Sequence, residues 1–250
     1  MKKHPRQDNQ RSGRPRQRRP RFPREIAILY EDESVIAINK PAGLLAVPFK
    51  GSNVPSALSV LSAELKARRQ RVFIVHRIDR FSSGILLFAK TGRDRDTLVQ
   101  QFLSHIPVRQ YLAVVRGRLG AREGTLVHYF RRQGMHQKLT TEKDREGARA
   151  ELRYFVERPL QAASLVRVTL VTGLQNQIRV QLSALGHPVI GDRKYSPREA
   201  EESRIARVAL HAVHLEFIHP RSGKKISIDC EPPADFRSLL QALSLPAGTK

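Results

Sequence analysis

A short charged segment between two apolar runs restricts the fold of this chain most. The runs at residues 72–75 and 85–89 have the length and composition of buried strands. Between them the chain places Asp79 between Arg77 and Arg80, at the end of a strand. Neighbouring cations keep such a carboxylate ionised. From this segment alone, a structural ion pair in a turn explains the pattern better than a catalytic group does.

The net charge indicates the class of partner. The 250 residues carry 45 Lys and Arg against 23 Asp and Glu, a net charge of +22. Residues 1–25 hold ten basic and two acidic side chains, which leaves +14 on the rest of the chain. This balance indicates a polyanion. Nucleic acid is favoured over a membrane because the basic segment lacks the apolar face of a membrane-surface helix. A basic surface that only keeps the protein soluble is the simpler alternative.

Composition predicts one domain that follows a basic tail. Residues 1–24 are mainly Arg, Pro, Gln and Gly, so we expect a disordered basic tail, followed by one domain over residues 25–245. No apolar run approaches the roughly 18 residues of a membrane span, and no signal-peptide pattern follows the basic start. The single Cys230 excludes an intramolecular disulfide. We expect a cytoplasmic protein that binds no membrane and works as a monomer, since nothing in the sequence requires a partner chain.

The order of predicted elements favours an α+β fold over a doubly wound sheet, because strands and helices do not alternate strictly. Helix patterns occupy residues 55–68, 91–103, 176–185 and 232–243. The second of these begins at Thr91 and presents Leu98, Phe102 and Leu103 on its apolar face. Strand patterns occupy residues 26–30, 35–38, 108–115, 149–156, 164–171, 208–218 and 225–230, and residues 121–147 form a hairpin or an extended loop.

The motifs of cofactor and metal enzymes are missing from the sequence. Among nine histidines, His211 and His214 are three apart on a predicted strand, so their side chains point to opposite faces. We therefore expect no metal site. No Gly-x-Ser-x-Gly elbow, phosphate-binding loop or dinucleotide fingerprint occurs, so we expect no cofactor. Such a chain suits a reaction on nucleic acid that needs neither redox chemistry nor a metal.

The segment around Asp79 closely resembles the signature of the RluA-type RNA pseudouridine synthases. The match covers residues 76–90, HRIDRFSSGILLFAK, and further stretches agree in order at residues 39–44, 110–117, 172–179, 185–192 and 210–212. Together they span about residues 26–230. The resemblance implies a pseudouridine synthase fold, with a mixed, mostly antiparallel sheet flanked by helices and loops. Residues 1–24 are too few for the family's frequent S4 domain, so we expect a stand-alone catalytic domain.

The resemblance also implies a reaction and a set of site residues. The enzyme would isomerise specific uridines of structured ribosomal or transfer RNA to pseudouridine, by detaching the base at nitrogen and rejoining it through carbon 5. Asp79 would attack or deprotonate the sugar, and Arg179 would pair with it. Tyr111 would stack on the base, with a phenol suited to proton transfer. Arg77 would fill the space left by the flipped uridine. Arg80 would bind substrate, with phosphate as its contact.

The C-terminal motif departs from the family at three positions. The usual run is Thr-Gly-Arg-x-His-Gln-Ile-Arg-x-His, whereas residues 172–181 are TGLQNQIRVQ. Leu174 replaces an arginine, and Asn176 and Gln181 replace histidines that titrate near neutral pH. These changes motivate an alternative: a catalytically idle RNA-binding or ribosome-assembly factor on the same fold. Because Asp79, Tyr111 and Arg179 are retained, we expect an active enzyme with altered substrate contacts.

Overall fold

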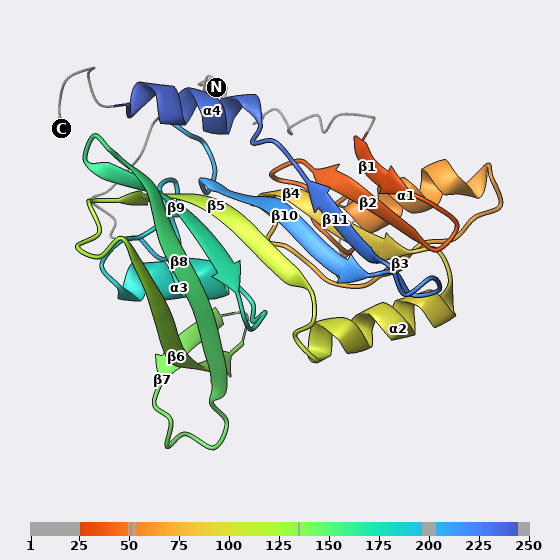
Figure 1. The fold of residues 1–250 in the computed structure, drawn as a ribbon, viewed down its shortest axis with the longest axis horizontal. Coiled ribbons are helices and arrows are strands. Elements are labelled where there is room, and N and C mark those ends of the chain that lie inside the picture. Colours follow the sequence, from red (N-terminus) through yellow and green to blue (C-terminus); the bar gives the residue numbers. More distant parts are fainter. Residues whose placement is uncertain (1–25, 50, 52–53, 135, 197–203, 245–250) are drawn as a thin grey trace, which may run out of the picture.

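The computed structural model describes residues 26–49, 51, 54–134, 136–196 and 204–244 (Figure 1). The predicted basic tail at residues 1–24 lies outside them. The helices are α1 (Ala57–Lys66), α2 (Gly92–Leu103), α3 (Gln177–Ala184) and α4 (Ala234–Ala242). The strands are β1 (Ile28–Glu31), β2 (Val35–Lys40), β3 (Phe73–Ile74), β4 (Ser83–Ala89), β5 (Val108–Arg116), β6 (Glu123–Gln133), β7 (His136–Thr140), β8 (Ala148–Leu160), β9 (Ala163–Leu170), β10 (Leu210–Ile218) and β11 (Lys225–Asp229).

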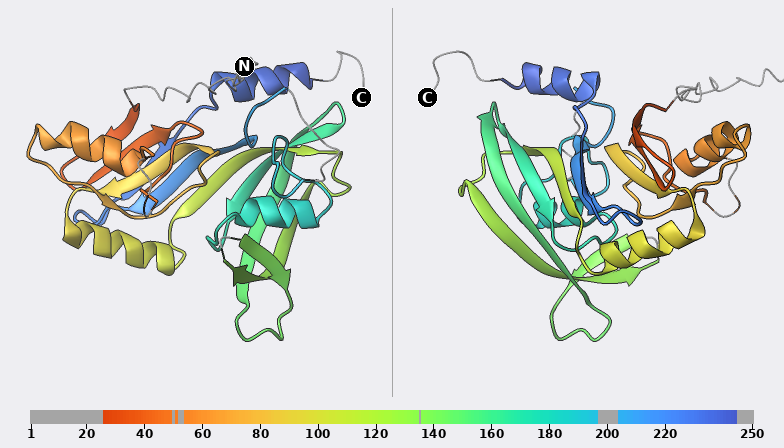
Figure 2. Two further views of the ribbon diagram at one scale, coloured as in Figure 1. Left: turned by 180° about the vertical axis from the view of Figure 1, so that it is seen from behind. Right: turned by 45° about the vertical axis from the view of Figure 1, so that its right-hand side comes forward.

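The described strands form one sheet in the order β1-β2-β4-β10-β5-β9-β8-β6-β7, with β11 paired to β10 and β3 to β4. Only the contact of β4 with β10 is parallel among these pairs. Figures 1 and 2 show that the β1–β2–β4 half and the β9–β8–β6 half splay apart on either side of β10 and β5. The predicted α+β class with a mixed, mostly antiparallel sheet is confirmed.

Both faces of the β2–β4 pair are buried. Side chains alternate along a strand, so Ile36 and Ile38 point to one face and Val35 and Ala37 to the other. The first face packs on Leu61 and Leu65 of α1, in one of two large apolar clusters. Val35 and Ala37 join the central cluster instead. These strands therefore need continuous apolar sequence, as residues 35–38 and 85–89 have.

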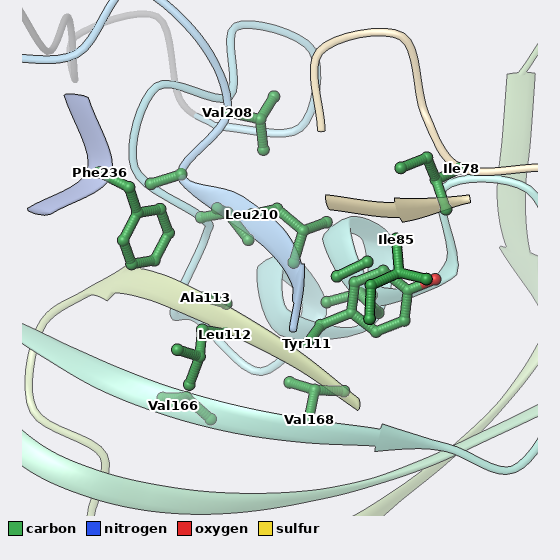
Figure 3. Close-up of a cluster of buried hydrophobic side chains, with 14 of the residues drawn as sticks. Ile78, Ile85, Tyr111, Leu112, Ala113, Val166, Val168, Val208, Leu210 and Phe236 are labelled. Atoms are coloured by element: carbon green, nitrogen blue, oxygen red, sulfur yellow. The ribbon is translucent and has the colours of Figure 1, made fainter. Parts of the chain in front are cut away.

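The central cluster lies around β5, which crosses the middle of the sheet. Figure 3 shows the ring of Tyr111 beside Ile78 and Ile85 and away from Phe236 of α4, while Val166 and Val168 lie on the neighbouring strand β9. Tyr111 therefore lies where the core borders the Asp79 segment. A third, smaller cluster joins α3 to the sheet through Val180, packed against Phe130 and Ala150.

The structure differs from the predicted elements in two details. Of residues 72–75, only Phe73 and Ile74 pair as a strand, because the charged segment that follows turns away as a loop. The apolar face predicted for α2 is confirmed at Leu98 and Phe102 but wrong at Leu103, which is 65% exposed near the helix end. No helix in the described part of the chain has the length and apolar character needed to cross a membrane.

Gly84 fixes the start of β4 against β10. Its φ is +106°, and a Cβ there would lie 2.2 Å from the Ala212 carbonyl oxygen. Gly84→Ala should therefore lower the free energy of unfolding by at least about 1 kcal/mol, since both backbone strain and the clash oppose the side chain. Urea denaturation measures this. Gly92→Ala is the matched control, because a Cβ at Gly92 meets nothing within 4 Å. Equal stability of the two variants would contradict the assignment.

Candidate active site

Asp79 forms an ion pair with a residue 100 positions away. The Nη1 of Arg179, on α3, donates to Oδ2 of Asp79 at 3.1 Å. Within the described residues, neither Arg77 nor Arg80 forms a salt bridge with Asp79. The interpretation from the local sequence, a carboxylate held by its two flanking arginines, is therefore wrong. The partner is the arginine that the family resemblance implied.

Arg179 is held in one orientation by two further side chains. Its Nε and Nη2 donate to the two carboxylate oxygens of Asp192 at 2.7 and 2.8 Å, and its Nη1 also donates to Oδ1 of Asn176 at 2.9 Å. Although burial opposes its charge, hydrogen bonds and charge from Asp192 and Asp79 raise the pKa of Arg179. The guanidinium therefore stays charged, in the bidentate geometry that carboxylates favour. The sequence contained Asp192 in a family motif but gave no sign of this function.

Lys40 fixes the loop that carries Asp79. Its buried Nζ donates to the carbonyl oxygens of Pro41 (3.0 Å), Leu44 (2.9 Å), Arg80 (3.1 Å) and Ser82 (2.7 Å). It thus joins the loop after β2 to the loop before β4. Burial lowers the pKa of Lys40 to about 7, while the charge of Asp79 acts in the opposite direction. A buried ammonium needs such acceptors, and here they are all backbone carbonyls.

Tyr111 supplies a buried phenol beside the ion pair. It projects from β5, with Ile78 and Ile85 near its ring (Figure 3). Burial raises the pKa of Tyr111 to about 12, and the charges of Arg109 and Asp79 act on it in opposite directions. The hydroxyl is therefore protonated at neutral pH. It is close enough to feel both charges, so it lies in the same site as Asp79.

Two cavities meet at the ion pair. The first, of about 450 Å³, is lined by Asp79, Tyr111 and Arg179. This volume is in the range of small-molecule sites. The second, of about 800 Å³, shares Arg77, Asp79 and Arg179 with the first. The basic side chains that line the second cavity are Arg77, Arg80, Arg132, Arg179, Arg193, Lys194 and Arg207, and Asp79 is the one carboxylate among its described lining residues.

The two arginines that flank Asp79 differ in their contacts. Arg77 is exposed and lines both cavities, at their junction. Arg80 lines only the second, where its Nε donates to the Gly43 carbonyl at 3.0 Å and its guanidinium lies 5.2 Å from the Phe81 ring centroid. Arg80 thus joins its own loop to the loop of Gly43, whereas Arg77 borders both cavities.

The three departures from the family motif are uncharged side chains that pack or form hydrogen bonds within the fold. Leu174 packs in the third apolar cluster. Asn176 adopts a left-handed backbone (φ 56°), accepts from Arg179, and donates to the Tyr195 hydroxyl at 3.2 Å. Gln181 Nε2 donates to the Leu126 and Ala150 carbonyls at 2.9 and 3.1 Å, which ties α3 to β6 and β8. The pairing of Arg179 with Asp79 is therefore preserved despite the three changes.

A Ser-His pair beside the site is sealed from solvent. Ser83 Oγ lies 2.9 Å from Nδ1 of His211, whose Nε2 lies 2.9 Å from the Cys230 carbonyl. Burial lowers the pKa of His211 to about 4, so the ring is neutral, accepts from Ser83 and donates to Cys230. Both side chains are buried, so no substrate reaches them. The described residues also contain no group of three metal-ligating side chains.

Comparison with known proteins agrees with this geometry. Residues 34–184 match the model of the RNA pseudouridylate synthase family. The chain is 35% identical over 232 residues to ribosomal large subunit pseudouridine synthase D of Zymomonas mobilis, covering 88% of this chain and 73% of that protein. An uncharacterized RNA pseudouridine synthase of Bacillus subtilis is 34% identical over 227 residues, covering 88% and 74%. The solved structure of human RNA pseudouridylate synthase domain containing 4 matches the fold with a TM-score of 0.73 at 21% identity, covering 88% of this chain and 94% of that one.

The chain belongs to the RluA-type RNA pseudouridine synthases. It is an isomerase that converts uridine in RNA to pseudouridine. The alternative of a catalytically idle RNA-binding factor is not favoured, because the matches are to proteins named as synthases.

The pH dependence of stability tests the buried position of Lys40. The pKa of Lys40 is about 7 in the folded protein and about 10.5 in the unfolded chain. The folded state therefore binds fewer protons between these values, and the free energy of unfolding rises with pH there, by at most about 1.4 kcal/mol per pH unit. Lys40→Met removes this contribution, so urea denaturation should show the stability gap to wild type widening as pH rises from about 7 to about 9.

The exposed Lys66 of α1 provides the control for this experiment. Lys66→Met removes a solvent-exposed ammonium and is the reference at each pH. If the gap for Lys40→Met did not widen relative to this reference, the buried ammonium would not titrate in this window.

Proposed function

We propose that this enzyme modifies uridines of ribosomal RNA, with Asp79 as its catalytic carboxylate. The observation that carries the proposal is the Asp79–Arg179 ion pair at the junction of two cavities, with Tyr111 beside it. The ribosomal substrate is supported by relatives such as the Zymomonas protein, which are named as ribosomal large subunit pseudouridine synthases. Transfer RNA is the alternative substrate, and a map of modified uridines in both RNAs distinguishes the two.

In the proposed mechanism the first cavity receives the flipped uridine. The base stacks on the ring of Tyr111, which stays a neutral phenol because burial raises its pKa to about 12. The ribose then faces Asp79, which attacks or deprotonates the sugar. Arg179 directs that carboxylate, since Asp192 fixes the guanidinium plane. Arg77, exposed at the junction of the cavities, takes the space that the flipped base leaves in the RNA stack.

The second cavity is the proposed path of the RNA strand. Its basic lining neutralises phosphates, and such contacts position a nucleic acid without reading its sequence. Phe49 and Phe81 are exposed there and offer faces on which unpaired bases stack. Arg80, held over Phe81, is the proposed phosphate contact. This arrangement favours a looped or locally opened segment of structured RNA.

One chain supplies the whole proposed site. Asp79, Tyr111 and Arg179 come from the same polypeptide, which supports a monomeric enzyme. A cytoplasmic location is proposed because ribosomal RNA is there, and we propose no membrane partner.

The isosteric variant Asp79→Asn tests the catalytic assignment. It should lower the single-turnover rate by at least about 10³-fold, because an amide neither attacks nor deprotonates the sugar. RNA affinity should stay within about threefold of wild type, since the phosphate contacts are untouched. Asp96→Asn is the control, because Asp96 is exposed on α2, lines neither cavity, and pairs with its neighbour Arg95. Loss of binding with normal turnover at saturating RNA would contradict the proposed role.

A map of pseudouridine in ribosomal and transfer RNA, with and without the gene, tests the substrate. We expect at least one uridine of ribosomal RNA to lose its modification in the deletion strain and to regain it with wild type but not with Asp79→Asn. Dependence confined to transfer RNA would overturn the ribosomal assignment.

A further inference from the structure

A buried arginine in the first cavity has no carboxylate partner. Arg109 is 8% exposed and lines the cavity with Asp79 and Tyr111. It lies two residues before Tyr111 on β5, so both side chains project from the same face of the sheet. Its Nη2 donates to the Val171 carbonyl at 3.2 Å, while its Nε is buried and has no hydrogen-bond partner. No acidic side chain of the described residues forms a salt bridge with it.

This arrangement disfavours the cation and therefore points to a ligand. Burying a charge without a partner carries a large desolvation penalty. Burial accordingly lowers the pKa of Arg109, in contrast to Arg179, whose pKa is raised by two carboxylates. The cavity thus holds two buried guanidiniums, of which only one is neutralised by the protein. The other, Arg109, is available to a negative charge on the substrate.

Neighbouring groups hold the Arg109 guanidinium in place. It lies 5.7 Å from the ring centroid of Phe102, and His76 stacks on the same ring at 4.6 Å. A Cβ on Gly173 would lie 2.4 Å from Nη1 of Arg109, so the backbone of this loop packs directly against the guanidinium. Burial lowers the pKa of His76 to about 3, so its imidazole is neutral and adds no second positive charge near Arg109.

The position of Arg109 relative to Tyr111 suggests which substrate group it faces. The Tyr111 hydroxyl feels the charge of Arg109 as well as that of Asp79. In the proposed mechanism the ribose faces Asp79 and the base lies on Tyr111. Arg109, which shares the sheet face of Tyr111, then faces the uracil ring and not the sugar.

We propose that Arg109 stabilises the uracil anion formed during the reaction. This inference rests on the proposed function. When the bond between nitrogen 1 and carbon 1′ breaks, its electron pair leaves with the uracil. Carbon 1′ of the sugar then gains a bond to Asp79, or a double bond to carbon 2′ as the carbon 2′ proton passes to Asp79. A ring electron pair of the anion then forms the bond from carbon 5 to carbon 1′, while the bond to Asp79 breaks or Asp79 returns the proton to carbon 2′. The ring is now neutral, and transfer of the carbon 5 proton to nitrogen 1 completes the pseudouridine. A preorganised cation at such a developing charge is a strong catalytic device.

The variant Arg109→Met tests this assignment. It should lower the single-turnover rate at saturating RNA by about 10²–10³-fold, as expected for loss of one preorganised donor, with KM within about threefold. Its melting temperature should equal or exceed that of wild type, because an unpaired buried charge is removed. Arg167→Met is the matched control: Arg167 lies on β9, pairs with Glu157, and lines neither cavity. It should keep the wild-type rate.

A substrate with a better leaving group separates electrostatic catalysis from positioning. Fluorine at carbon 5 of uridine withdraws electrons and stabilises the anion, so base detachment from 5-fluorouridine RNA should suffer at least tenfold less from Arg109→Met than detachment from uridine RNA. Arg109→Lys keeps the charge without the fixed fork and should show a smaller rate loss than Arg109→Met. It also serves as the readout if the methionine variant does not fold.

Other outcomes would overturn the inference. A raised KM with an unchanged rate and a shallower salt dependence would make Arg109 a phosphate contact. Equal losses on both substrates, equal losses for lysine and methionine, or a lower melting temperature of Arg109→Met would assign it a structural role. Asp79→Asn, measured in parallel, separates the two proposals: if that variant stays active, the proposed function fails, whereas an inactive Asp79→Asn beside a fully active Arg109→Met overturns only this inference.

Discussion

The ion pair between Asp79 and Arg179 is the interaction on which the rest of the site depends. It joins the loop before β4 to helix α3, and thereby the two halves of the splayed sheet. A partly buried pair is weak by itself, since desolvation offsets much of the attraction. Here the remaining guanidinium donors are satisfied by Asp192 and Asn176, so the arginine keeps one orientation while Asp79 retains contact with the cavity. In the proposed mechanism the pair therefore positions the Asp79 carboxylate, and it contributes little to the stability of the fold.

Three buried cations near Asp79 differ in the partners that stabilise their charge. Lys40 is surrounded by backbone carbonyls and holds two loops together. Arg179 is neutralised by carboxylates and directs Asp79. Arg109 has one carbonyl partner and an unsatisfied Nε. The first two charges are used within the protein, which leaves the third available to the substrate. A site that binds a polyanion needs few carboxylates, and among the described residues that line the two cavities Asp79 alone carries one.

Sequence patterns predicted the elements well where burial follows a simple period. The apolar runs at residues 35–38 and 85–89 are strands because both of their faces are buried, and Thr91 caps α2 as its type favours. The residues around Asp79 could not predict its partner, because Arg179 lies 100 positions away in the sequence. Only the family resemblance predicted that Arg179 pairs with Asp79. Leu103 was misplaced because an apolar residue at a helix end need not face the core.

The roles of Lys40, Arg109 and Asp192 share the reason that they were missed. The contacts of each depend on atoms from other segments: carbonyls of two loops for Lys40, and the α3 guanidinium for Asp192. For Arg109 the decisive fact is the lack of a carboxylate partner within the described residues, which only a three-dimensional structure reveals. The same reasoning applies to the motif departures. Asn176 and Gln181 carry amides, which do not titrate, and these amides bind Arg179 and tie α3 to β6 and β8.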